Sequence, residues 1–141
     1  MSSGGLPTII FAHGAFHRKD AFDACSTHLE TAGYKVVIKQ NPTASSDPDT
    51  IAHGFEADVA QVHDEARKAA AMGADVVLVG HSYGGVLITE AAKGLAKGSS
   101  GLSGGVVRLV YICAFAPDVG QSLISTSGGK AADWIIPVVR G

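Results

Sequence analysis

Residues 75–85, with the sequence DVVLVGHSYGG, join a strand pattern to a Gly-x-Ser-x-Gly turn. Asp75 to Val79 is short, apolar and rich in valine, which predicts a buried strand. Gly80 to Gly85 predicts a tight turn, and Val86 to Lys97 has the pattern of a helix. This strand–turn–helix setting is typical of a nucleophile elbow, the sharp turn that presents a nucleophilic side chain, here that of Ser82.

The same alternation of strands and helices continues on both sides of this segment. The other predicted strands are Thr8 to Ala12, Lys35 to Lys39 and Val106 to Phe115. The other predicted helices are Asp20 to Ala32, which Gly33 ends, and Thr50 to Met72, which Gly73 ends. Loops are predicted at Asn41 to Pro48 and at Gly98 to Gly105. Strands that alternate with helices predict right-handed βαβ units on a parallel sheet. We therefore expect an α/β fold with about four parallel strands between helices, in one domain over residues 1–141.

Composition excludes several classes of protein. Of the 141 residues, 46% are hydrophobic and 17% are charged, which excludes a disordered chain. The net charge of −2, without a cluster of lysines or arginines, gives no electrostatic basis for binding nucleic acid or an anionic membrane. No apolar run approaches the roughly 20 residues of a membrane span. The first residues lack the basic and apolar regions of a signal peptide, so none is expected there.

The two cysteines, Cys25 and Cys113, are far apart and form no CxxC pattern. We therefore expect no metal site, reduced thiols and a cytoplasmic protein. The sequence does not predict the oligomeric state.

The turn around Ser82 has the glycines that its geometry requires. A serine in a strained backbone conformation needs neighbours without a Cβ atom, because a side chain at Gly80 or Gly84 would crowd the adjacent strand and helix. The helix that follows directs its N-terminal amides at the site and favours negative charge there. The alternative is a glycine-rich turn that carries its serine incidentally.

A second motif, HGAFH at residues 13–17, follows the first predicted strand. Acyl transfer needs two amide donors aimed at the developing oxyanion. One is expected to be the backbone amide of Tyr83, and the other that of Ala15, with Phe16 as the alternative. An ordinary turn at the end of a strand could have a similar sequence.

With these motifs the sequence resembles a small α/β-hydrolase related to plant methylesterases and hydroxynitrile lyases. The resemblance rests on HGAFH at 13–17, LETAGY at 29–34, VVLVGHSYGG at 76–85 and VYICAFAP at 110–117, and it is continuous from about Pro7 to about Trp134. It implies a three-layer α/β-hydrolase fold. It also implies a serine esterase that acts on small carboxylic esters through an acyl-enzyme on Ser82, without a metal or organic cofactor.

Two alternatives stay open within this resemblance. In a hydroxynitrile lyase of the same group, the serine and a histidine would act as acid and base on a cyanohydrin. A non-catalytic binding module would keep the pocket without the catalytic triad. The identity of the substrate does not follow from the sequence.

The chain departs from the resemblance in the order of its residues. The family arranges its triad as serine, carboxylate and then histidine along the chain. All six histidines, at positions 13, 17, 28, 53, 63 and 81, precede Ser82. We therefore expect a truncated chain: residues 1–118 would form an incomplete core, and residues 119–141 would begin a cap segment. The triad acid, the triad histidine and the last strands would lie beyond Gly141, and this chain alone would be inactive.

Weaker candidates lie elsewhere. Asp118 follows the fourth predicted strand, where some hydrolases place the triad acid, although a turn or capping role is more common there. His17 is expected near the mouth of the site, as a substrate contact or as an exposed surface residue. His81 is expected to turn away from the serine and pack locally. The acidic residues predicted on the solvated side of a helix are Asp58, Asp64 and Glu65.

Overall fold

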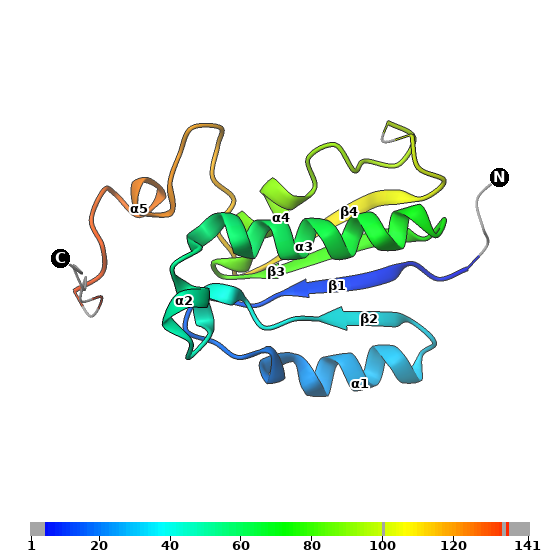
Figure 1. Ribbon diagram of the computed structural model, residues 1–141, viewed down its shortest axis with the longest axis horizontal. Helices are drawn as coiled ribbons and strands as arrows, with labels where there is room; N and C mark the ends of the chain where they lie inside the picture. Colours follow the sequence, from blue (N-terminus) through cyan, green and yellow to red (C-terminus); the bar gives the residue numbers. More distant parts are fainter. Residues whose placement is uncertain (1–4, 100, 134, 136–141) are drawn as a thin grey trace.

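Four parallel strands form one sheet in the computed structural model, which describes residues 5–99, 101–133 and 135. The strands are β1 (Thr8–Ala12), β2 (Lys35–Ile38), β3 (Asp75–His81) and β4 (Gly105–Ile112), in the order β2-β1-β3-β4 across the sheet (Figure 1). Each neighbouring pair is parallel. The predicted α/β fold with about four parallel strands is therefore confirmed.

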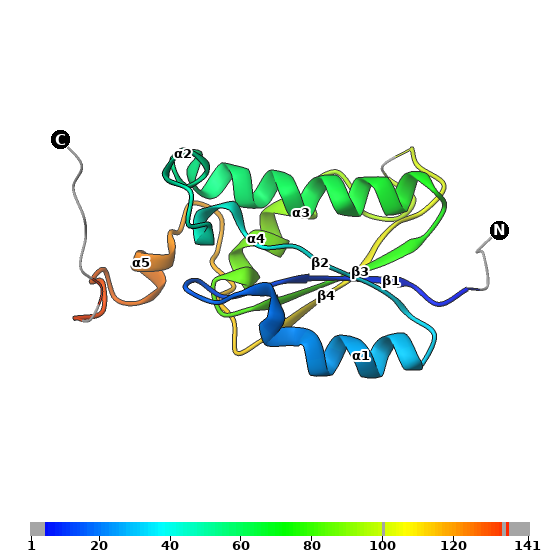
Figure 2. The same cartoon turned by 60° about the horizontal axis from the view of Figure 1, so that its bottom comes forward.

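Helices cover both faces of this sheet, as Figure 2 shows. On one face lies α1 (Asp23–Thr31), and on the other lie α3 (Gly54–Ala71) and α4 (Gly84–Ala91). The shorter segments are the 3-10 turns Lys19–Phe22 and Pro42–Ala44, α2 (Pro48–Ile51) and α5 (Leu123–Thr126). Helix, sheet and helix form the three expected layers. None of the helices within the described ranges is long and apolar enough to cross a bilayer.

The register of the sheet brings two loops together. Ala12, the last residue of β1, pairs with Gly80 near the end of β3. Because these strands are parallel, the loops that leave them emerge side by side at the carboxyl edge of the sheet. Since β2 lies on one side of β1 and β3 on the other, the chain also reverses its direction of travel here. Ligand sites in open α/β sheets form at such switch points.

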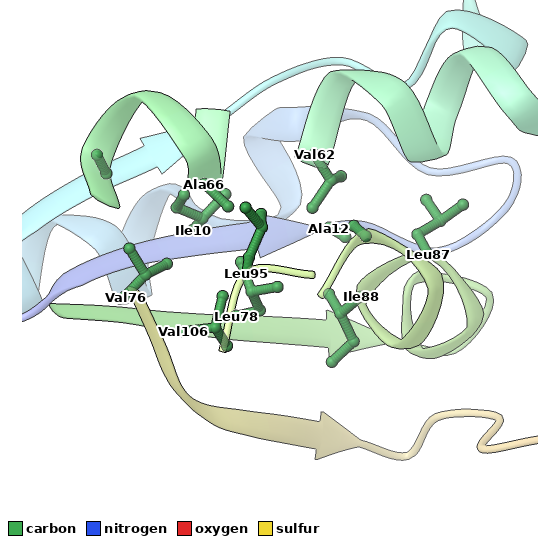
Figure 3. Packing of buried hydrophobic residues seen from close by; sticks show 12 residues of the cluster. Ile10, Ala12, Val62, Ala66, Val76, Leu78, Leu87, Ile88, Leu95 and Val106 are labelled. Carbon is green, nitrogen blue, oxygen red and sulfur yellow. The ribbon is translucent and has the colours of Figure 1, made fainter. Parts of the chain in front are cut away.

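The core explains why the strands are apolar throughout. Alternate residues of a strand face opposite sides of the sheet, so β1 sends Ile10 toward α3 and α4, and Phe11 toward α1. Figure 3 shows the larger of the two clusters, in which Leu78, Leu87 and Ile88 are fully buried. Strands buried on both faces need apolar residues at successive positions, which is the pattern of TIIFA and DVVLV.

Glycines in the left-handed conformation decide several helix boundaries. Gly33 (φ 92°) and Gly73 (φ 84°) follow α1 and α3, as predicted. The predicted helix from Thr50 to Met72 is wrong in its first turns, because Gly54 (φ 66°) separates α2 from α3. The predicted helix from Asp20 to Ala32 begins as a 3-10 turn and becomes α-helical only at residue 23.

Two predicted boundaries nearer to Ser82 are also wrong. The helix predicted to run to Lys97 ends at Ala91, because Gly94 (φ 73°) turns the chain and the residues after it bridge to the start of β4. The strand predicted to run to Phe115 ends three residues earlier, because Cys113 (φ 43°) leaves the extended conformation.

Strand β4 forms an edge of the sheet as described. Residues 95–97 hydrogen-bond to Val106 at its start, but from Val107 onward its outer side faces no strand within the described ranges. Val107, Tyr111 and Ile112 are 46%, 39% and 41% exposed. From the sequence, the apolar residues Trp134, Ile135 and Ile136 are candidates to fold back over part of this edge. Trp134 and Ile136 lie outside the described residues, whereas Ile135 lines a cavity together with Ser82.

Candidate functional site

Ser82 lies between β3 and α4 in a backbone conformation that is rare for a residue with a side chain. Its φ is 53°, in the left-handed region. The Ser82 amide donates to the carbonyl oxygen of Ile112 at 3.4 Å. Its own carbonyl oxygen accepts hydrogen bonds from the amides of Gly85 at 3.0 Å and Phe115 at 3.1 Å. The expected strand–turn–helix geometry is present, and residues that follow β4 help to hold it.

The glycines of this turn stand where no side chain fits. A Cβ atom on Gly80 would lie 2.5 Å from the carbonyl oxygen of Gly84. One on Gly84 would overlap the carbonyl oxygen of Ala12 in β1, and one on Gly85 would overlap that of Phe115. Backbone segments that are far apart in the sequence therefore touch directly around the turn. The crowding predicted for Gly80 and Gly84 is confirmed.

Backbone strain gathers at the carboxyl edge of the sheet. In the described part of the chain, the residues other than glycine with positive φ are Phe16 (62°), Ser82 (53°) and Cys113 (43°). They follow β1, β3 and β4, respectively. The left-handed conformation is costly for a residue with a Cβ atom, and such strain clusters at functional sites. The edge that carries Ser82 is therefore the candidate site.

His13 fixes the loop that follows β1. Its side chain is completely buried. His13 Nε2 accepts a hydrogen bond from the amide of Asn41 at 2.9 Å, and Nδ1 donates to the carbonyl oxygen of Gly14 at 2.9 Å. The side-chain amide of Asn41 donates to the carbonyl oxygen of His13 at 3.1 Å. Burial lowers the pKa of His13, which favours the neutral ring that this pair of hydrogen bonds requires.

The three backbone amides considered as oxyanion donors lie around one cavity. Ala15, Phe16 and Tyr83 line the same cavity as Ser82. The amides of Ala15 and Tyr83 have no hydrogen-bond acceptor among the described residues. The carbonyl oxygen of Ala15 accepts a hydrogen bond from His17 Nδ1 at 3.0 Å, which fixes the loop on the side away from the amide.

The cavity over Ser82 has a volume of about 490 Å³. Its far wall comes from α5 and the residues after it, which lie beyond the carboxyl ends of the strands (Figure 1). Leu123, Ile124 and Ile135 make this wall largely apolar, and Lys130 adds a positive charge. A small, mostly apolar molecule with one polar group fits such a lining.

Two histidines lie near Ser82 without hydrogen-bonding to it. His17 lines the cavity on an exposed loop, and its ring meets the edge of His81 with 5.3 Å between centroids. His81 also packs edge-on against Phe22 at 6.3 Å, which is the local packing predicted for it. No histidine within the described ranges hydrogen-bonds to Ser82 Oγ. The described residues thus bring together the serine and the amide donors, but no hydrogen-bonded base.

Asp118 lines a neighbouring cavity of about 380 Å³ and is not part of the lining over Ser82. The Asp118 amide donates to Gln121 Oε1 at 3.0 Å, and its carbonyl oxygen accepts from the Gln121 amide at 2.9 Å. Asp118 therefore stabilises a turn after β4. Tyr83 and Leu123 lie in the walls of both cavities.

The prediction that Asp58 is solvated is wrong. Asp58 is 0% exposed and accepts three hydrogen bonds, two from Thr43 and one from the hydroxyl group of Tyr83. Its position in α3 explains the error. Asp58 lies four residues before Val62 and eight before Ala66, so it shares their buried face. The helical spacing carried this signal, but the residue type suggested solvent.

Of the other two acidic residues predicted on the solvated side, Asp64 is exposed, as predicted. Glu65 is partly buried and forms an ion pair with Lys68 at 3.1 Å. Cys25 and Cys113 are both exposed thiols. Across the described part of the chain, no three His, Cys, Asp or Glu residues gather closely enough to hold a metal ion.

Comparisons with known proteins extend over nearly the whole chain. A family model described as the alpha/beta hydrolase family matches residues 9–140. Alpha/beta hydrolase nvfD from Aspergillus novofumigatus is 42% identical to this chain over 118 residues, which cover 83% of this chain and 46% of that protein. The chain spans about half the length of the curated relatives that it matches.

Solved structures agree with this arrangement of elements. A polyneuridine aldehyde esterase superposes with a TM-score of 0.70 at 22% identity, covering 90% of this chain and 49% of that chain. A methylesterase from Arabidopsis superposes with a TM-score of 0.64 at 23% identity, covering 82% and 47%. At these identities the likeness is one of fold.

Proposed function

The chain belongs to the alpha/beta hydrolase family, and from that premise we propose that it carries the nucleophile of a serine esterase for small carboxylic esters. One observation carries the proposal: Ser82, in a strained backbone conformation after β3, lines a cavity of about 490 Å³ together with Ala15 and Tyr83. A strained serine at a strand–helix turn is costly, and such a cost persists where a site requires it.

In the proposed reaction, Ser82 Oγ attacks the carbonyl carbon of the ester while a base removes its proton. The tetrahedral intermediate then expels the alcohol, which takes up that proton, and the acyl group stays on Ser82. Water, activated by the same base, releases the carboxylic acid and restores the serine. The sequence of steps requires no metal or organic cofactor.

The oxyanion of the tetrahedral intermediate is assigned to the backbone amides of Tyr83 and Ala15, with Phe16 as the alternative to Ala15. Support comes from the absence of any other acceptor for the amides of Ala15 and Tyr83 among the described residues. The first turn of α4 adds a favourable field for negative charge. Donors that are already oriented in this way stabilise a developing oxyanion most.

We assign the base and its orienting carboxylate to residues outside this chain, in the region that corresponds to the half of the relatives that the chain does not span. His13 is completely buried, and both of its ring nitrogens are engaged in hydrogen bonds, whereas His17 and His81 contact each other. On this proposal, residues 119–141 begin a cap over the cavity, and the chain by itself is inactive. A cytoplasmic location and a small-molecule ester as the partner also stay predictions.

The test is the hydrolysis of p-nitrophenyl acetate by the full-length protein and its Ser82→Ala variant. Removal of the nucleophile is expected to lower kcat by about three orders of magnitude or more. Ser99→Ala is the matched control, since Ser99 is exposed and its hydroxyl group donates to the nearby carbonyl oxygen of Ala96. Turnover that survives in Ser82→Ala would refute the assignment. A failure of the wild-type protein to react with a fluorophosphonate would favour a binding module.

A further inference from the structure

A buried carboxyl group joins three separate segments beside the elbow. Asp58 on α3 has no exposed surface. Its Oδ1 accepts a hydrogen bond from the backbone amide of Thr43 at 2.9 Å. Its Oδ2 accepts hydrogen bonds from Thr43 Oγ1 at 2.5 Å and from the hydroxyl group of Tyr83 at 3.0 Å. A buried carboxyl group with three donors fixes the relative positions of the groups that donate to it.

The Tyr83 end of this network is the residue that follows Ser82. Burial, with the negative charge of Asp58 beside it, raises the pKa of Tyr83 well above its ordinary value. The hydroxyl group therefore remains protonated at any working pH and remains a donor to Asp58. The Tyr83 ring also meets the edge of Phe55 with 6.3 Å between centroids. The side chain of residue 83 is thus anchored to α3 at its tip and along its ring.

The backbone of residue 83 makes few hydrogen bonds of its own among the described residues, although its neighbours Ser82 and Gly84 are held by backbone contacts. Tyr83 has helical dihedral angles (φ −52°, ψ −32°), and its carbonyl oxygen accepts from the Val86 amide at 3.0 Å. Its amide has no acceptor in the described part of the chain. The neighbouring Ser82, at φ 53°, is strained, and strain of this kind persists only when the surroundings determine the conformation.

We propose that Asp58 is a positioning residue of the site, which holds Tyr83 through its hydroxyl group and so keeps the Tyr83 amide aimed at the oxyanion. This inference rests on the proposed function, because it needs an oxyanion at Ser82. The hydrogen bond between Tyr83 and Asp58 affects the transition state because it orients the Tyr83 amide. Asp58 is fully buried and does not reach bound substrate, so its loss is expected to lower kcat and to leave KM nearly unchanged.

The experiment compares Tyr83→Phe, Asp58→Asn and the double variant in the full-length protein, with p-nitrophenyl acetate as substrate. Rates are expressed per serine labelled by a fluorophosphonate, so that unfolded protein does not count. Tyr83→Phe keeps the amide and the ring and removes the hydroxyl group that donates to Asp58. Its kcat is expected to fall about tenfold, less than the loss for removing an oxyanion donor outright, with KM within about twofold. Asp58→Asn should act in the same direction.

The double variant is expected to lose no more kcat than the more affected single variant, because both changes act through the same contact between residues 58 and 83. Tyr111→Phe is the matched control: it removes a phenol hydroxyl that bonds to Thr89, away from the Ser82 cavity, and should leave kcat unchanged. If Tyr83→Phe lowers the melting temperature but keeps the wild-type kcat, the positioning role is refuted even where Asp58→Asn fails to fold. If Ser82→Ala also keeps its activity, the proposed function itself has failed.

Discussion

Gly84 and Ala12 touch through their backbones, so that a Cβ atom added to Gly84 would overlap the carbonyl oxygen of Ala12. The contact seats the first turn of α4 directly on the end of β1. It also places the amide end of α4 beside the loop that holds Ala15. This backbone contact therefore helps to set the distance between the two sides of the proposed oxyanion site.

Substitution of Gly84 by valine should unfold this arrangement. The branched side chain can be accommodated only if α4 moves off the sheet, so the free energy of unfolding should fall by about 3 kcal/mol or more. Urea unfolding of the purified protein measures the loss. Gly5→Val is the matched control, because nothing lies within 4 Å of a Cβ atom on Gly5. An unchanged unfolding midpoint in Gly84→Val would contradict the contact.

The buried ring of His13 predicts how stability depends on pH. Its pKa in the folded protein is lowered from the ordinary value near 6.5, so below about pH 6.5 the unfolded chain binds more protons than the folded one. The contribution of His13 to stability is complete above that pH and is lost as the pH falls toward the lowered pKa. His13→Gln should flatten the decline in unfolding free energy below pH 6.5. His28→Gln, which removes an exposed ring, should follow the wild-type curve, and a His13→Gln curve parallel to wild type would refute the idea.

The open edge of β4 predicts the behaviour of residues 1–141 expressed alone. Unpaired backbone groups beside the exposed Val107 invite edge-to-edge association, so the chain should elute from size-exclusion chromatography as a mixture of oligomers. Val107→Lys should shift it toward the monomer. Met72→Lys is the control, because Met72 is 70% exposed at the end of α3 but lies on no strand. A monodisperse wild-type monomer that hydrolyses activated esters through Ser82 would contradict both this prediction and the proposed need for a further base.

Leu87 tests how far the core supports the elbow. It is fully buried in the first turns of α4, against the strands that carry the site. Leu87→Ala should lower the free energy of unfolding by about 2–5 kcal/mol, since it removes buried surface and leaves a cavity. Leu6→Ala, at a position that is 54% exposed, should change it by about 0.5 kcal/mol or less. Equal effects of the two substitutions in thermal or urea unfolding would show that α4 is not packed as described.

The sheet could be predicted from the sequence because its strands have a distinctive local pattern. A strand buried on both faces is a run of apolar residues closed by a turn, and TIIFA and DVVLV are such runs. The turn around Ser82 could also be predicted from the sequence, because a strand and a helix that meet so closely require residues without a side chain at Gly80 and Gly84.

Features that depend on tertiary contacts could not be predicted from the local sequence pattern. The end of β4 follows from the left-handed Cys113, a conformation that the residue type does not favour. Burial of Asp58 is favourable only because Thr43 and Tyr83, from distant parts of the chain, supply donors to it. A pattern read along one helix cannot include those partners. The assignments of Ser82, Ala15 and Tyr83 to catalytic roles stay predictions.

The division of the sheet into two unlike ends has a practical consequence. Every loop that shapes the cavity leaves a carboxyl end, whereas the turn from α1 to β2 at Gly33 lies at the opposite end. A seven-residue strand such as β3 keeps the two ends about 20 Å apart. The turn at Gly33 is therefore suited to the insertion of an affinity tag, a fluorescent reporter or a guest domain. Such an insertion would remain a full strand length away from Ser82.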